Sequence, residues 1–257
     1  MPETSRQRPY ENSQITPLKG TRTGMRKLTR NTIIGGAVAV AALGLTSIPA
    51  SAVTGVDISA TGAVAPSNPI SGVNSGNVTA KDNSTGAAIT CSKGTAAGTS
   101  QIGVNLPLAG VATVSSLALS SPANPSGWCS GPAGITVQVT TSGFPYTMNV
   151  TGVTNASGVT PGTLTGIKAS IVGSDNCHAT VSGPGGAGGT ISGSYSNTSH
   201  ALTTGGTGST SNLTVQTVDA NCDPTLINAG DSISLNGSFT VTPGSPATGF
   251  LTINSHT

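Results

Sequence analysis

The chain contains little charge and few aromatic rings. Charged residues make up 7% of its 257 residues, and aromatic residues make up 3%. Residues 53–257 hold no Glu and no Arg, and their three Lys and six Asp give a net charge of −3 (3 − 6). A protein that binds nucleic acid usually presents a basic surface to the phosphates, so we expect no nucleic-acid partner.

A concentrated set of catalytic groups is also lacking. The six Asp lie mostly in turn-like contexts, where Asp caps the backbone, and the sequence has no G-x-S-x-G nucleophile motif. A glycosidase usually needs two carboxylates across a cleft. We therefore expect a protein that is not an enzyme and has no cofactor. A secreted hydrolase with a dispersed Asp/His site is the alternative, because catalytic groups can assemble in space from distant residues.

The sequence also lacks an apolar run that is long enough to span a membrane. The apolar stretch at residues 32–45 is shorter than the ~20 residues that a span needs, and glycines interrupt it. Basic residues at positions 26, 27 and 30 precede this stretch, and Ala50-Ser51-Ala52 follows it. A basic segment, an apolar segment and a small-residue cleavage site are the three parts of a secretory signal peptide.

These parts predict how the precursor is divided. We expect residues 25–52 to be a Sec-type signal peptide that is cleaved after Ala52. Met25 stands where such a signal peptide should start, so residues 1–24 are expected to be an upstream extension outside the true precursor. No transmembrane anchor should remain after cleavage. The product would be extracellular or associated with the cell wall.

Four cysteines are present, all in residues 53–257. An even number in an exported chain predicts two disulfides, for which three pairings are possible. Proximity in sequence, and the likeness of "SDNC" to "DANC", favour Cys91 with Cys129 and Cys177 with Cys222. No C-x-x-C motif is present, which argues against a cysteine-based zinc site.

Apolar residues alternate with polar ones along much of the chain. In "SISLNGSFTVT" (232–242), Ile233, Leu235, Phe239 and Val241 share one face, and residues 135–140 and 146–151 alternate likewise. A period of two predicts half-buried antiparallel strands. We expect residues 76–257 to form an all-β domain, an antiparallel β-sandwich or barrel-like sandwich of about ten strands.

Residues between these strands are rich in turn formers. The segment "DNSTG" (82–86) predicts a hairpin between strands at 77–81 and 87–91. The segment 53–75 is rich in Gly, Pro, Asn and Ser and predicts a partly ordered arm.

One short stretch combines an acid, a thiol and an imidazole: Asp175, Cys177 and His178. A cystine offers no thiolate nucleophile, so Asp175 is expected to turn the chain and Cys177 to anchor a strand. In the strand 178–182, His178 is expected to point to solvent with Thr180 and Ser182. His178 remains a weak candidate for a functional role.

A glycine-rich run follows that stretch. Gly183, Gly185 and Gly188 fit the dinucleotide pattern G-x-G-x-x-G, but a strand pattern follows where the motif requires a helix. We therefore expect a flexible loop that joins strand 178–182 to a strand starting at Thr190 in a hairpin.

Two further places carry weak candidates. Asp219 and Asp223 flank Cys222 and could hold a hard cation such as calcium through oxygen, although a plain turn fits the spacing better. Trp128, beside Cys129, could form a small sugar platform. Packing of its indole on the disulfide is the favoured interpretation.

Several segments resemble a family. They are "TGAAITC" ending at residue 91, "GVATVSSLALS" (110–120), "GFPYTMN" (143–149), "GTLTGIKASIVGSDNCHATVSG" (162–183), "GSYSNTSHALT" (193–203) and "INAGDSISLNGSFTVTP" (227–243). Their order is similar to that of small secreted actinobacterial proteins of unknown function. The resemblance covers about residues 77–243 and departs in a longer approach to Cys129, "SSPANPSGWC". It implies an exported product of a Gram-positive cell and brings no catalytic residues.

The expected function follows from these features. We expect an exported, non-catalytic β-domain at or released from a Gram-positive cell surface. Its uncharged Ser, Thr and Asn faces would bind envelope polysaccharide or a protein partner. Besides the hydrolase, a second alternative is a subunit of an envelope pore or surface array, whose strands would present apolar residues outward around a closed ring.

Overall fold

The computed structural model describes residues 52–206 and 209–257. The predicted upstream extension and the signal peptide up to residue 51 lie outside these residues. Within the described residues the regular structure consists of seventeen strands and three 3₁₀ turns, at Pro125–Gly127, Pro132–Gly134 and Pro184–Gly186. This part of the chain has no helix of the length and apolarity needed to cross a membrane.

The strands are spread over the whole described part. They are β1 (Gly55–Thr61), β2 (Ser67–Asn74), β3 (Val78–Asp82), β4 (Ala88–Cys91), β5 (Lys93–Gln101), β6 (Gly103–Leu106), β7 (Ala112–Ser120), β8 (Cys129–Ser130), β9 (Thr136–Ser142), β10 (Tyr146–Val150), β11 (Val159–Gly173), β12 (His178–Ser182), β13 (Gly189–Ser196), β14 (Ala201–Thr204), β15 (Leu213–Val218), β16 (Ser232–Pro243) and β17 (Thr248–His256).

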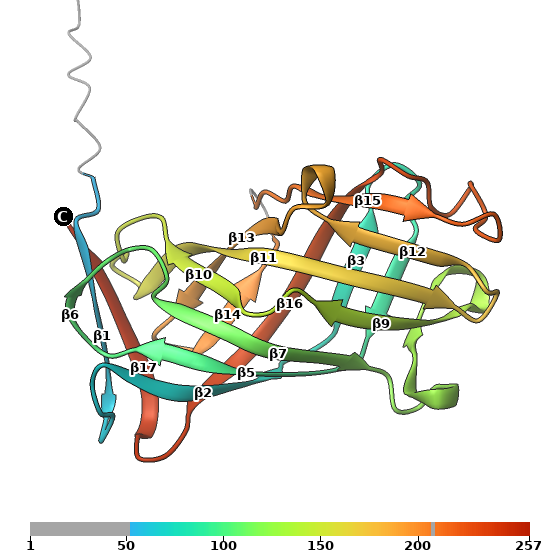
Figure 1. Cartoon of the computed structure of the whole chain (residues 1–257). Helices are drawn as coiled ribbons and strands as arrows, with labels where there is room; N and C mark the ends of the chain where they lie inside the picture. Colours follow the sequence, from blue (N-terminus) through green and yellow to red (C-terminus); the bar gives the residue numbers. More distant parts are fainter. Residues whose placement is uncertain (1–51, 207–208) are drawn as a thin grey trace, which may run out of the picture. The chain divides into compact units, whose positions relative to one another are not determined.

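Most of these strands close into a barrel whose pairings are all antiparallel. Twelve of the strands form six pairs that lie end to end, and each pair acts as one long strand because its two members bond to the two halves of the same neighbouring long strands. The pairs are β2 with β3, β4 with β5, β7 with β8, β9 with β10, β12 with β13, and β14 with β15. Together with β11 and β16 they follow one another in chain order, and β16 closes the ring on β2 and β3 (Figure 1). The predicted all-β antiparallel class is confirmed, in its barrel form.

The alternation of side chains explains how the barrel forms. Ile233, Leu235, Phe239 and Val241 of β16 face the interior, as the period of two predicts. Gly237 also lies on the inner side, and the alternate residues Ser234, Asn236, Ser238 and Thr240 face outward. Outward hydroxyls bond across strands, for example Thr180 to Thr217 over 2.7 Å. Such cross-strand pairs of Thr and Ser stabilise a sheet whose outer face contains few apolar residues.

The glycine-rich loop corrects one prediction. Strands β12 and β13 do not pair with each other in the described part but both pair with β11, Ala169 lying opposite Val181 and Ile167 opposite Gly189. The two strands are therefore collinear, and residues 183–188 bulge out between them rather than joining a hairpin. A Cβ atom at Gly188 would lie 2.5 Å from the Cα of Gly166 in β11, which is too close for any side chain. The loop can therefore approach β11 again at this position only with a glycine.

A small sheet covers one end of the barrel. It has the order β17-β1-β6, and its Val56, Ile58 and Leu251 pack with Val150 and Tyr195 of the barrel (left in Figure 1). The segment 53–75 is thus not an arm: β1 is bonded by β17 and β6, and β2 by β5 and β16.

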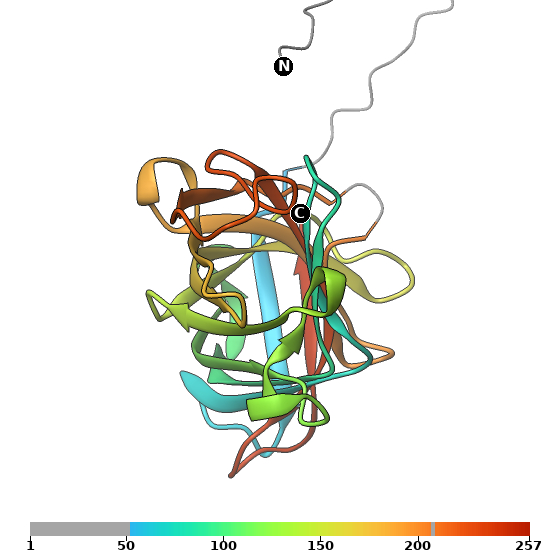
Figure 2. The same ribbon diagram turned by 90° about the vertical axis from the view of Figure 1, so that its right-hand side faces the viewer.

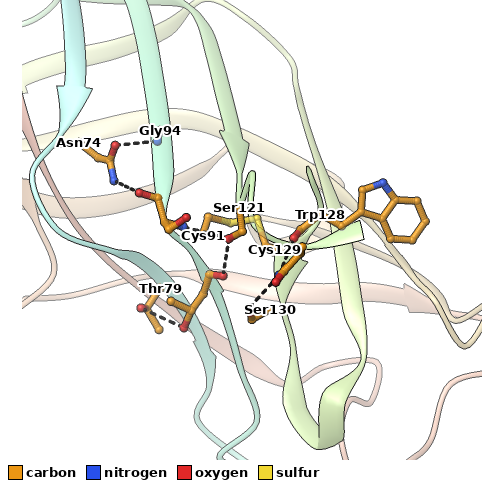
Figure 3. The surroundings of a disulfide bond; sticks show 11 residues. Asn74, Thr79, Cys91, Gly94, Ser121, Trp128, Cys129 and Ser130 are labelled. Carbon is orange, nitrogen blue, oxygen red and sulfur yellow. Dashed lines mark hydrogen bonds between the residues drawn. A yellow bond between two sulfur atoms is a disulfide. The ribbon is translucent and has the colours of Figure 1, made fainter. Parts of the chain in front are cut away.

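Both disulfides pair as favoured, Cys91 with Cys129 and Cys177 with Cys222. The first lies where the barrel has few hydrogen bonds, because β4 and β8 pair through the single contact of Thr90 with Ser130 (Figure 3). The second ties the start of β12 to the loop after β15. Both therefore reinforce the end of the barrel that the small sheet leaves uncovered.

Candidate functional site

The interior of the barrel is not filled by its side chains. A cavity of about 150 Å³ lies in the half that contains the disulfides. Its lining is almost entirely apolar and includes Leu117, Leu119, Val139, Ile171 and Leu235. These five side chains are only half-buried although they face inward, since the cavity leaves part of their surface uncovered. Protein interiors are normally close-packed, so an opening of this size is a feature to be explained.

Small inward residues account for part of this space. Ala80, Ala169 and Gly173 occupy inward positions on β3 and β11 and line the cavity. Eight-stranded barrels are just wide enough for side chains to fill them or for one small ligand to be enclosed. With alanine and glycine at these positions, the barrel has room for a ligand.

A second, smaller cavity continues the first toward the covered end. Its volume is about 70 Å³, and the two share Val78, Leu117, Leu119 and Leu235 as lining residues. Tyr146 also lines both cavities, and its side chain is 1% exposed. Its ring therefore lies at the boundary between the two spaces.

The hydroxyl of Tyr146 holds that ring in place. It lies 2.9 Å from the carbonyl oxygens of both Ser142 and Lys168 and donates its single proton to them. Ser142 ends β9, and Lys168 lies opposite it on β11, so the hydroxyl bridges these two paired strands. Burial raises the pKa of Tyr146, which favours the protonated form that donates these hydrogen bonds.

The larger cavity reaches the uncovered end of the barrel, which we call the mouth. Figure 2 looks directly at this end. The mouth is framed by the turns at 83–87 and 174–176 and by the loop at 219–231, and Thr85 Oγ1 donates to the carbonyl of Leu226 over 2.9 Å to join two of them. Asp82, Asp175 and Asp223 are the carboxylates that line the cavity here.

Asp82 is the most deeply placed of these acids. It ends β3 on the same face as Val78 and Ala80, and it is 5% exposed. Its Oδ1 accepts the backbone N–H groups of Ser84 and Thr85, over 2.8 and 3.0 Å. Its Oδ2 is buried and has no hydrogen-bond partner among the described residues. Sequence reasoning missed Asp82 as a site residue by assigning it to the turn, although the alternation of Val78, Ala80 and Asp82 places all three on one face.

Two neighbouring acids are held in their charged form. Partial burial opposes the ionisation of Asp231, but hydrogen bonds with Ser84, Asn228 and Asp82 outweigh it and lower the pKa of that carboxyl. The pKa of Asp223 is lowered by the N–H and hydroxyl groups of Thr225, both 2.8 Å from its Oδ1. The mouth therefore carries negative charge at neutral pH.

The remaining predicted candidates lie around the mouth. His178 is exposed on β12, and the exposed Asp175 accepts the N–H of Cys177 over 3.2 Å. Asp219 lies near Cys177 and Cys222, with ligand atoms within 4.8 Å of one another. Both sulfur atoms belong to the disulfide and offer no thiolate to a metal.

Trp128 takes no part in this site. Figure 3 shows its indole directed away from the disulfide of Cys91 and Cys129, rather than packed on it as expected. The ring is partly exposed on the loop between β7 and β8.

Comparison with known proteins adds no assignment. No protein-family model, curated protein or solved structure matched the chain. Of the resemblance described above, the structure shows an all-β protein with two disulfides. Disulfides are typical of an oxidising compartment.

Proposed function

We propose that the chain is a non-catalytic binding protein that holds a small apolar molecule, or the apolar part of a larger one, inside its barrel. The observation that carries this proposal is the apolar cavity of about 150 Å³. An empty apolar cavity of that volume costs about 3–4 kcal/mol of stability, and a ligand that fills it recovers much of that cost. Apolar cavities of similar size in other proteins stay dry and take up benzene-sized molecules.

A series of straight-chain alcohols from butanol to decanol tests the proposal. Isothermal titration calorimetry on the full chain should show affinity rising with each added methylene, by about 0.8 kcal/mol per buried CH₂, until the cavity is full. Ala169→Leu fills the cavity from an inward position of β11 and should abolish the rise. Ser170→Leu adds the same side chain at the next position, which faces outward, and should leave binding unchanged. Equal affinity across the series, or unaltered binding by Ala169→Leu, would contradict the proposal.

Export and binding at a cell surface form part of the same proposal. Support comes from the predicted signal peptide and from the two disulfides. The outward Ser, Thr and Asn side chains offer hydrogen bonds to an envelope polysaccharide or a protein, which gives a second candidate for the outer surface. Enrichment on purified cell wall over a charge-matched control protein tests this candidate.

A hydrolase is supported by one observation, the proximity of Asp82 and Asp231 at the mouth. The apolar lining of the cavity favours binding instead, because sugar and peptide substrates need polar groups around the bond that is cleaved.

A further inference from the structure

The unpartnered oxygen of Asp82 requires an explanation. A buried carboxylate oxygen without a hydrogen-bond donor loses its hydration, and no new hydrogen bond offsets the free-energy cost of that loss. The Asp82 side chain is 5% exposed, and its Oδ2 accepts no hydrogen bond from the described part of the chain. Buried charges in proteins are as a rule paired with a cation or a donor. Within the described residues Asp231 reaches Asp82, but an ionised carboxylate offers no donor. The oxygen is therefore satisfied either by a proton shared with Asp231 or by a donor from a bound ligand.

The geometry of Asp82 is fixed before any ligand arrives. Its Oδ1 is held by the N–H groups of Ser84 and Thr85, and its own backbone closes the turn through Gly86 N–H to Asp82 O, over 3.0 Å. The side chain lies on the cavity face of β3 with Val78 and Ala80. A carboxylate that is already ordered loses little entropy when a donor binds to it.

The charge around the mouth favours a cation. Asp175 and Asp223 line the same cavity, and Asp231 interacts with Asp82. In the described residues the one salt bridge joins Asp57 to His256, which belong to β1 and β17 at the covered end. Lys81, the basic residue next to Asp82, is exposed and on the opposite face of β3. None of the acids at the mouth thus has a basic partner within the described residues.

Resting on the proposed function, we propose that the ligand is an apolar amine whose ammonium group binds Asp82 Oδ2 while its hydrocarbon part fills the cavity. An ammonium group supplies both a hydrogen-bond donor and a positive charge to pair with the Asp82 carboxylate. Such charge-assisted hydrogen bonds are stronger than neutral ones. The hydrocarbon part meets Leu117, Ile171 and Leu235. A bare metal ion fits less well, because calcium takes six to eight oxygen ligands and most of this lining is hydrocarbon.

Three ligands of equal chain length test this inference: octylamine, octanol and octanoate, each titrated calorimetrically into the full chain at neutral pH. Octylamine should bind at least about tenfold more tightly than octanol, and octanoate more weakly than both. Asp82→Asn keeps an oxygen for the N–H groups of Ser84 and Thr85 but removes the charge, and it should lower octylamine affinity to that of octanol. Asp57→Asn, at the covered end, is the matched control and should leave all three affinities unchanged.

The outcomes separate the two proposals. Equal binding of octylamine and octanol to the wild-type chain, a comparison that needs no variant, overturns the amine assignment and leaves the apolar cavity as the binding site. Binding of none of the three overturns the proposed function itself. A thermal stabilisation by Ca²⁺ alone that matches that of octylamine, and that Asp82→Asn removes, overturns the amine in favour of a hard cation.

Discussion

At the scale of single residues, Tyr146 links the fold to the cavity. Its ring forms the boundary between the two interior spaces, and its hydroxyl, next to the bend between β9 and β10, bridges the backbones of β9 and β11. Phe144 stacks on the ring with centroids 4.4 Å apart, which adds support from the same bend. The length of ligand that the barrel accepts should therefore depend on this one side chain.

Two substitutions of Tyr146 separate these roles. Tyr146→Phe keeps the boundary but loses the donor to Ser142 and Lys168, and it should lower the free energy of unfolding by about 1–2 kcal/mol without changing the alcohol length at which affinity stops rising. Tyr146→Ala should cost about 3–5 kcal/mol, join the two cavities and shift that limit to longer alcohols. Urea denaturation and calorimetry measure both effects. An unchanged length limit in Tyr146→Ala would show that the ring does not divide the interior.

At the scale of strands, the two halves of the barrel are held in different ways. The half near the small sheet has long ladders, such as the seven residue pairs between β2 and β5. In the half near the mouth, β4 meets β8 through one pair, and β15 meets β16 through two. The disulfide of Cys91 with Cys129 replaces the hydrogen bonds that the seam between β4 and β8 lacks.

Removing that disulfide should loosen the mouth locally. The double variant Cys91→Ala/Cys129→Ala should lose roughly 2–4 kcal/mol of stability, since the bridge closes a loop of 38 residues in the unfolded chain. Hydrogen exchange should accelerate in β4 and β8 while β2 and β5 remain protected.

The variant Cys177→Ala/Cys222→Ala is the matched control, because its bridge spans a similar 45 residues. It should accelerate exchange at the start of β12 and in the loop after β15 instead. Uniform acceleration in either variant would mean that the two seams do not open independently.

The same scale shows what the sequence could predict. The alternation in β16, β9 and β10 identifies the inward residues, because side chains in any strand point to opposite faces in turn. The path of the chain around residues 183–188 was not predictable in this way. Turn residues between two strand patterns suggest a hairpin, and only the register of both strands on β11, which is set by distant contacts, shows that they are collinear.

Asp82 illustrates the corresponding limit for the site. Its place in "DNSTG" identifies a turn residue, and the structure confirms that it accepts turn N–H groups. Its orientation into the cavity depends on β3 continuing to residue 82, where it pairs with Ile233. The cavity itself arises from the closure of the barrel, which no local pattern encodes.

At the scale of the whole molecule, the two ends of the barrel differ in chemistry. The mouth carries carboxylates whose charged forms are stabilised, as at Asp223 and Asp231. The covered end contains Tyr195, which is 6% exposed and donates its hydroxyl to the carbonyl of Leu251 in β17 over 2.9 Å. Burial raises the pKa of Tyr195 to about 12. Acid and alkali should therefore destabilise the molecule from opposite ends.

The direction of each effect follows from proton linkage. The lowered pKa values of Asp223 and Asp231 contribute stability that is present above the ordinary carboxyl value of 3.8 and is lost as the pH falls through the values in the folded protein. The raised pKa of Tyr195 contributes stability that is complete below its ordinary value of 10.0 and is lost as the pH rises toward about 12. Urea denaturation across the pH range should show both declines. Tyr195→Phe should flatten the alkaline decline and Asp231→Asn the acidic one, and an alkaline decline that Tyr195→Phe leaves unaltered would show that the covered end does not open first in alkali.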